Sequence, residues 1–204
     1  AKSQGRDILI HMPMQPMSAV KIEDGGLHLG MSSAQVNDRV NTAKNIVNDA
    51  IGMNNHMGSA ATADPQLMTY LMTALQEKHL FFLDSRTIGK SVAGKIAQEQ
   101  GVRSLDRHIF LDDSNELADF QHQFQAAMQY ARKHGTAIAI GHPRPNTIAV
   151  LQAGINNLPE DIQLVGMGNL WRNEKVIPPK PFILLFTEMP APTSIEPFEP
   201  VGLL

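Results

Sequence analysis

Short apolar runs with the length of β-strands recur along the chain, and each of them ends at a polar residue. The runs ILI, LFFL and AIAIG, for example, lead into His11, Asp84 and His142. Stretches with the apolar spacing of amphipathic helices separate these runs. This alternation predicts an α/β fold with a parallel sheet, in which the carboxyl ends of the strands meet at one edge. We therefore expect polar residues that are distant in sequence to lie around one cavity.

The same pattern gives the expected elements. Ser32 with Gln35 forms a capping box, and Asp64 before Pro65 is typical of a helix start. Strands are expected at residues 7–10, 50–53, 80–83, 109–111, 136–140 and 162–165. Helices are expected after Ser32 and after Asp64, and at residues 91–100, 115–133 and 147–156, the last of them capped by Asn146. Strands and helices in this alternation predict a partial (β/α) barrel.

The two ends of the chain differ in character from the middle. Beyond Trp171 frequent prolines preclude continued helix, so we expect a barrel domain at residues 1–172 and a Pro-rich tail at 173–204 that lies over the surface. Ala1 to Gly5 resemble the last turn of a helix closed by a glycine. Because a domain rarely begins inside a helix, we expect the N-terminal strands of the barrel to be missing from this chain.

Composition excludes several classes of function. The 204 residues are 43% hydrophobic and 18% charged, which is ordinary for one globular domain. The formal net charge of −3 gives no electrostatic reason to expect nucleic acid as a partner. No apolar run approaches the roughly 20 residues of a membrane span. Without cysteine, any transition metal has to be held by histidines and carboxylates.

Three histidines follow predicted strands and are candidates for a site. His11 stands in Ile10-His11-Met12, His56 in Asn54-Asn55-His56, and His142 before Pro143. Taken singly, each could equally be a structural histidine held by hydrogen bonds. Three of them on one predicted rim favour a metal-dependent or acid–base site.

Two carboxylate groups also follow apolar runs. Asp84 emerges from a buried strand, where a charge is costly unless it is paired, and either Arg86 or a catalytic group could satisfy it. Asp112-Asp113 offers a second pair, but capping of the following helix by Asp113-Ser114 is the preferred interpretation.

Five segments in order resemble a known family. The segments are ILIHMPMQP, GMNNHMGS, FFLDSRT, IFLDD and IAIGHPRPNT, between about Gly5 and Leu170. They resemble the divergent polysaccharide deacetylase family of the YibQ type, which is related to the NodB-like deacetylases. The resemblance implies an irregular (β/α) barrel of the NodB-like, TIM-barrel-like type. It also implies a hydrolase that removes N-acetyl groups from an envelope glycan, with a divalent metal, usually zinc.

The resemblance also implies roles for individual residues. His11 matches the first metal-binding histidine, whereas the second would fall at Gln15 and is not retained, so we infer that His56 replaces it. His142 matches the histidine that protonates the leaving amine. Asp84 lies where the family has a carboxylate that supports the site. The Asp-Asp motif of related deacetylases would lie before Ala1.

The remaining expectations concern substrate, location and an alternative. Asn54, Asn55 and Arg86 are candidates to bind sugar hydroxyls or the developing oxyanion of an N-acetylated glycan. The resemblance implies a periplasmic or cell-envelope location. The alternative is a non-catalytic periplasmic barrel that binds a glycan or a protein, which the loss of the second metal histidine favours.

Overall fold

The structure is a computed structural model that describes residues 2–114 and 116–172. Its strands are β1 (Leu9–Met14), β2 (Gly52–Met57), β3 (Phe81–Asp84), β4 (Ser104–Asp106), β5 (Ile109–Phe110) and β6 (Ala139–Ile140). Its α-helices are α1 (Ser33–Ile46), α2 (Pro65–Glu77), α3 (Ala93–Glu99), α4 (Leu117–His134), α5 (Pro145–Asn156) and α6 (Met167–Arg172). Short 3₁₀ turns lie at Lys2–Gln4 and Ala61–Ala63.

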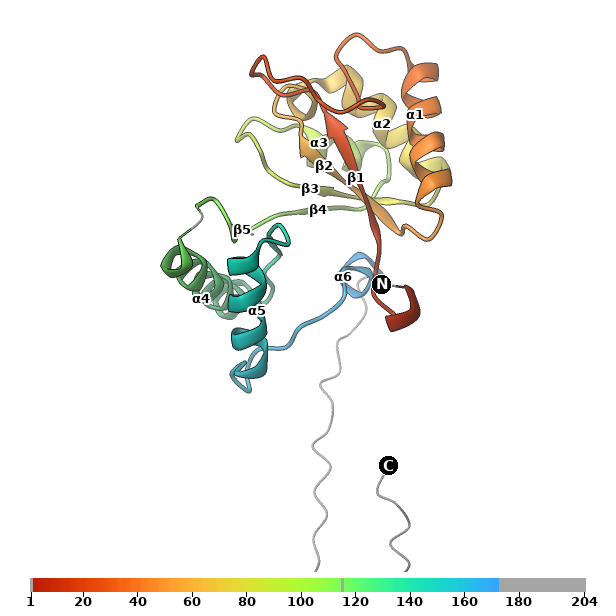
Figure 1. Ribbon diagram of the computed structural model, residues 1–204. Helices are drawn as coiled ribbons and strands as arrows, with labels where there is room; N and C mark the ends of the chain where they lie inside the picture. The colour runs from red at the N-terminus through yellow and green to blue at the C-terminus, as the bar shows by residue number, and fades with distance from the viewer. Residues whose placement is uncertain (1, 115, 173–204) are drawn as a thin grey trace, which may run out of the picture.

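The strands form two parallel sheets (Figure 1). One has the order β1-β2-β3-β4, and the other pairs β5 with β6. All the strand pairs are parallel, which confirms the prediction of an α/β fold with a parallel sheet. Within the described ranges the strands make these two open sheets rather than a closed barrel.

A bend of two residues joins the two sheets. Only Arg107 and His108 separate β4 from β5. The Arg107 backbone N–H donates to the Asp84 carbonyl at 2.9 Å, and that of His108 donates to the Ile138 carbonyl at 2.9 Å. One side of the bend is therefore tied to β3 and the other to the segment that leads into β6, so the two sheets are connected without a loop.

The helices begin where the sequence predicts for α1 and α2. The Ser32 hydroxyl accepts from the Gln35 backbone N–H, and the Gln35 side chain accepts from the Ser32 backbone, which confirms the capping box. The Asp64 side chain caps α2 at the Leu67 N–H. At α5 the expected cap is wrong: the helix begins at Pro145 after Arg144, with no side-chain cap.

Three elements differ from the predicted pattern. Residues 162–165 form no strand but lead into α6. β4 and α6 were not predicted, because β4 has a single apolar residue, Leu105, and α6 begins between two glycines, Gly166 and Gly168. The Pro-rich tail expected at 173–204 lies outside the described residues. Across the described ranges, no helix has the length and apolar character needed to cross a lipid bilayer.

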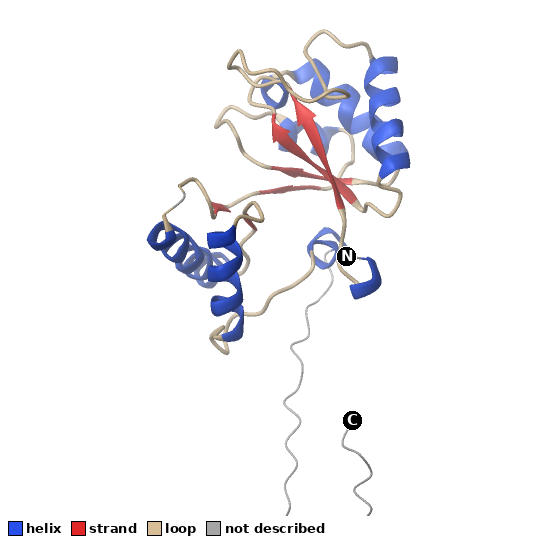
Figure 2. Ribbon diagram, in the orientation of Figure 1, coloured by secondary structure: helices blue, strands red, loops and turns tan. Residues whose placement is uncertain are grey.

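The four-stranded sheet, drawn in red in Figure 2, has apolar residues on both faces. Helices α1, α2 and α3 cover one face, where Ile10, Met12 and Met53 pack against them. On the other face Phe81 and Leu83 pack with Ile138, which directly precedes β6. The ring of Trp171 in α6 stacks on Phe81 with centroids 5.6 Å apart. Helix α6 therefore covers part of this second face. Polar side chains lie on the rest of it, and we call this second face the open face of the sheet.

His108 makes the bend sensitive to acid. Its Nδ1 accepts the Ile138 backbone N–H at 2.8 Å, which requires that nitrogen to be unprotonated. Burial lowers the pKa of His108 below its ordinary value, while Asp106 raises it and His134 lowers it. Since the unfolded chain then takes up a proton at higher pH than the folded protein, this contribution to stability is complete above about pH 6.5 and is lost as the pH falls through the folded pKa.

We expect His108→Asn to reduce the acid dependence of stability, because the Asn oxygen can accept the same N–H without titrating. The free energy of unfolding in urea, measured at pH 7.5 and 5.0, should fall less in the variant than in the parent protein. The other histidines are common to both proteins, so the difference reports on His108 alone. An equal fall in the two proteins would exclude this role.

Candidate metal centre and hydrolytic site

Three polar side chains lie on the open face of the sheet, within β1 and β2 and not after the strands as predicted. Successive residues of a strand point to opposite faces. Because Ile10, Met12 and Met53 face the helices, His11, Asn54 and His56 lie on the other face, and the parallel register pairs His11 with Asn54. Strand alternation thus brings together two of the predicted metal ligands.

The two imidazoles are in direct contact. His11 Nε2 and His56 Nδ1 are 3.2 Å apart, and the ring planes make an angle of 66°. Two nitrogens bound to one zinc at about 2.0–2.1 Å with a tetrahedral angle are about 3.3 Å apart. The observed separation therefore fits two adjacent ligand positions of a tetrahedral zinc ion.

A carboxylate that the sequence did not single out stands behind His56. Glu23, in the loop between β1 and α1, places its Oε1 3.6 Å from His56 Nε2. Metal-binding histidines commonly have a carboxylate on the ring nitrogen away from the metal, where it orients the ring. No signal in the sequence could have identified Glu23, because its position follows from the path of a long loop.

The surroundings of His11 favour its neutral form. The pKa of His11 lies below its ordinary value, chiefly because partial burial disfavours the charged ring. The hydrogen bond to Asn54 raises the pKa, the charges of His56 and His142 lower it, and Glu23 raises it. A neutral imidazole is the form that binds a metal. The effect of His142 also means that this third histidine lies within electrostatic reach of His11.

His142 is held by a buried carboxylate, Asp112. The Asp112 side chain is fully buried, and its Oδ2 accepts from the His142 backbone N–H at 2.7 Å. The same oxygen lies 3.0 Å from His142 Nδ1. Arg144 Nε lies 3.7 Å from this oxygen and balances its charge. The carboxylate thus fixes the ring through Nδ1 and leaves Nε2 for a substrate.

The interpretation of Asp113-Ser114 as the cap of the following helix is confirmed only for Ser114, whose hydroxyl accepts from the Glu116 backbone N–H at 3.1 Å. The N-cap of α4 is Glu116, which makes no side-chain capping bond. Asp112 instead pairs with a histidine 30 residues away across the second sheet. The signal available in the sequence was that Asp112, like Asp84, directly follows an apolar run.

Asp84 is not brought together with the histidines. It follows Leu83, which lies on the open face, so its own side chain points to the opposite face of β3. There Asp84 is fully buried and accepts from the Arg86 backbone N–H at 2.7 Å and the Ser91 hydroxyl at 2.6 Å. These bonds satisfy the carboxylate within its own turn.

The predicted substrate-binding residues differ in their exposure. Asn54 is buried between His11 and Ser85, and Asn55 is buried with its amide bonded to the Met57 carbonyl and the Ser85 N–H. Arg86 is exposed, with its guanidinium 3.9 Å from Asp106. Contact with a substrate stays a prediction for all three.

Gln15 stands where related deacetylases have their second metal-binding histidine, and its side chain makes a structural hydrogen bond. Its side-chain oxygen accepts from the Leu29 backbone N–H at 2.9 Å and so fastens the loop that carries Glu23. Among the described residues, no third His, Cys, Asp or Glu completes a set that could hold a metal ion. Of the predicted metal ligands, the structure therefore brings together two, His11 and His56.

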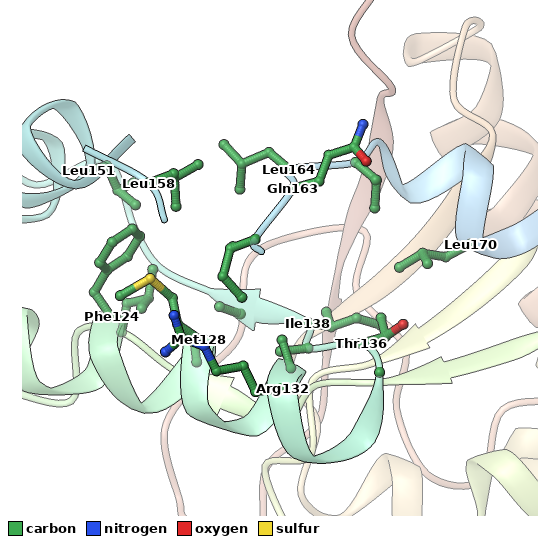
Figure 3. Close-up of a pocket in the computed structure, with 18 of the residues that line it drawn as sticks. Phe124, Met128, Arg132, Thr136, Ile138, Leu151, Leu158, Gln163, Leu164 and Leu170 are labelled. Carbon is green, nitrogen blue, oxygen red and sulfur yellow. The ribbon is translucent and has the colours of Figure 1, made fainter. Parts of the chain in front are cut away.

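A separate cavity of about 650 Å³ has a lining of its own (Figure 3). Side chains from α4, α5 and residues 158–167 line it, and they are mainly apolar, with Arg132 and Asp161 among them. None of the predicted site residues belongs to this lining. The candidate metal-binding and catalytic side chains therefore lie outside this cavity.

The fold and the site define an α/β protein with polar residues within and directly after its parallel strands. A family model described as divergent polysaccharide deacetylase matches residues 1–171. The chain belongs to this family, as its motifs indicate.

Two relatives and one solved structure are similar to the chain. An uncharacterized protein of Haemophilus influenzae is 93% identical over 204 residues, which are 100% of this chain and 73% of the relative. The uncharacterized protein YibQ of Escherichia coli is 44% identical over 183 residues, covering 88% of this chain and 57% of the relative. A crystal structure of an uncharacterized Agrobacterium tumefaciens protein has a TM-score of 0.78 at 21% identity, over 83% of this chain and 70% of that one. The last comparison supports the α/β fold alone.

Proposed function

We propose that the protein is a metal-dependent hydrolase that removes N-acetyl groups from an envelope glycan, built on an irregular (β/α) barrel. The observation that carries the proposal is the contact of two histidine nitrogens at 3.2 Å in a member of the divergent polysaccharide deacetylase family. His11 and His56 would hold the metal, and zinc fits their nitrogen donors. A periplasmic or cell-envelope location is part of the same proposal.

The positions of the ring nitrogens indicate how the two histidines would hold the metal. His11 would bind through Nε2 and His56 through Nδ1, which leaves His56 Nε2–H directed at Glu23. A bound divalent metal supplies an acidified water near neutral pH and polarises the carbonyl of the amide. Histidine donors and a carboxylate behind one of them suit this purpose.

His142 would supply the proton that the leaving amine needs. Hydrolysis adds water across the C–N bond, so the acetyl carbon gains oxygen and the nitrogen leaves as an amine only after it gains a proton. His142 Nε2–H would donate that proton while Asp112 holds Nδ1 and stabilises the imidazolium form. Arg86, exposed beside β3, is the best placed of the three predicted residues to contact a sugar.

One observation favours the alternative of a non-catalytic barrel that binds a glycan or a protein. The described residues offer two metal-binding side chains rather than three, and Gln15 fastens a loop where the family has a histidine. Such a protein would bind an N-acetylated glycan without changing it.

An assay on N-acetylated glycan oligomers separates these functions. The protein is incubated with the oligomers in the presence and absence of added zinc, and released acetate and oligomer masses are measured. Zinc-dependent loss of acetyl groups is the expected result. Binding of the oligomers without release of acetate would support the alternative and refute the hydrolase.

A further inference from the structure

The Ser85 hydroxyl, just beyond β3, has a fixed hydrogen. Its Oγ donates to the Asn55 backbone carbonyl at 2.8 Å, and a carbonyl can only accept. The Ser85 backbone N–H also donates to Asn55 Oδ1 at 2.8 Å. Ser85 is buried and held to β2 through both its backbone and its side chain. The single hydrogen of its hydroxyl is therefore committed.

This commitment fixes the orientation of the Asn54 amide. Ser85 Oγ lies 3.2 Å from the Asn54 side chain and, having given its hydrogen to Asn55, can only accept there. The atom of Asn54 that faces Ser85 must then be the donor Nδ2. Rotation of the amide by half a turn would place two acceptors against each other in a buried site.

The amide in turn fixes the proton of His11. Asn54 Oδ1 faces His11 Nδ1 at 3.1 Å, and because an amide oxygen only accepts, Nδ1 must carry hydrogen. In the neutral ring Nε2 then has the free electron pair. This nitrogen is the one that faces His56 Nδ1 at 3.2 Å.

We propose that Ser85, acting through Asn54, is a positioning residue that holds His11 in the Nδ1–H tautomer and so presents Nε2 as a ligand. The inference rests on the proposed function only in taking Nε2 as the metal-binding atom. The chain of bonds from Ser85 to His11 stands apart from it. Asn54 then serves the metal centre rather than the sugar.

The tautomer of His11 can be measured directly by ¹⁵N NMR of the metal-free protein at pH 8. In the parent protein the Nδ1 shift should be that of a protonated nitrogen and the Nε2 shift that of a bare one. Ser85→Ala removes the acceptor that orients Asn54, so His11 should become a mixture of both tautomers. Zinc affinity should fall about tenfold, which is the lower end of the loss seen when a residue that orients a metal ligand is replaced.

Two further variants separate positioning from a general structural effect. Thr73→Val removes a hydroxyl that bonds within α2, and it should leave the His11 spectrum unchanged. Adding Asn54→Asp to Ser85→Ala presents an oxygen to His11 in either orientation and should restore the Nδ1–H tautomer. The inference is wrong if the parent protein carries the proton on Nε2, or if Ser85→Ala keeps a pure Nδ1–H ring. Should the tautomers behave as expected while no variant binds zinc, positioning by Ser85 stands and the metal-dependent function fails.

Discussion

Replacing either His11 or His56 with alanine is expected to weaken zinc binding by at least about 100-fold, because each variant removes one of two contacting nitrogen donors. Isothermal titration of the metal-free proteins with zinc measures the affinity, and elemental analysis of the purified proteins gives the retained metal. The fold should persist, since both side chains lie on the open face of the sheet and outside the apolar cores. The free energy of unfolding should change by about 1 kcal/mol or less.

A histidine outside the two strands provides a matched control. His122 is exposed on α4, and His122→Ala should leave zinc affinity unchanged. Unchanged zinc content in both site variants would refute the assignment of the metal centre. Loss of zinc together with loss of the folded circular dichroism spectrum would instead make the two histidines structural.

Asp112→Asn is expected to lower the rate of deacetylation by roughly 10²–10⁴-fold without changing zinc affinity. The Asn oxygen can take the place of Oδ2 and still accept from the His142 backbone N–H, and the NH₂ group then takes the place of Oδ1, 3.2 Å from Nδ1. The ring would lose the negative charge that stabilises its imidazolium form, and the NH₂ donor would disfavour a proton on Nδ1. Initial rates of acetate release at saturating glycan and zinc measure the effect.

Comparison with His142→Ala tests whether the two residues act as one unit. If they do, the double variant should be no slower than His142→Ala alone, because groups that function together are not additive. Full activity of Asp112→Asn would show that the carboxylate serves only to close the second sheet. Reduced zinc affinity in this variant would contradict the separation of proton donor and metal centre.

The main elements of the fold could be predicted because local chemistry determines them. The capping box at Ser32 and the Asp64-Pro65 start use side chains within one turn of the helix end, so their signal is complete in the sequence. Strand β3 is an apolar run buried between two layers, whereas β1 and β2 continue through polar residues that the prediction placed after the strands. Their parallel order followed from the alternation of strands with helices.

Other features depend on contacts that no local pattern contains. β4 is a strand because β3 lies beside it, and α6 is placed by the stacking of Trp171 on Phe81. The pairing of Asp112 with His142 spans the second sheet, and the role of Asn54 depends on Ser85, which lies on the next strand's end. The sheet brings His11 and His56 together on one face, but the alternation of side chains along β3 directs Asp84 to the other face.

The bend at Arg107 and His108 divides the chemistry between two structural halves. Under the proposed function, capture of the metal would depend on β1 and β2, whereas delivery of the proton would depend on β5 and β6. Substitutions confined to the second sheet would then abolish turnover while recognition of the ligand at the first sheet survives. Such a protein would have a short evolutionary route from catalyst to lectin, and that route would pass through the second sheet.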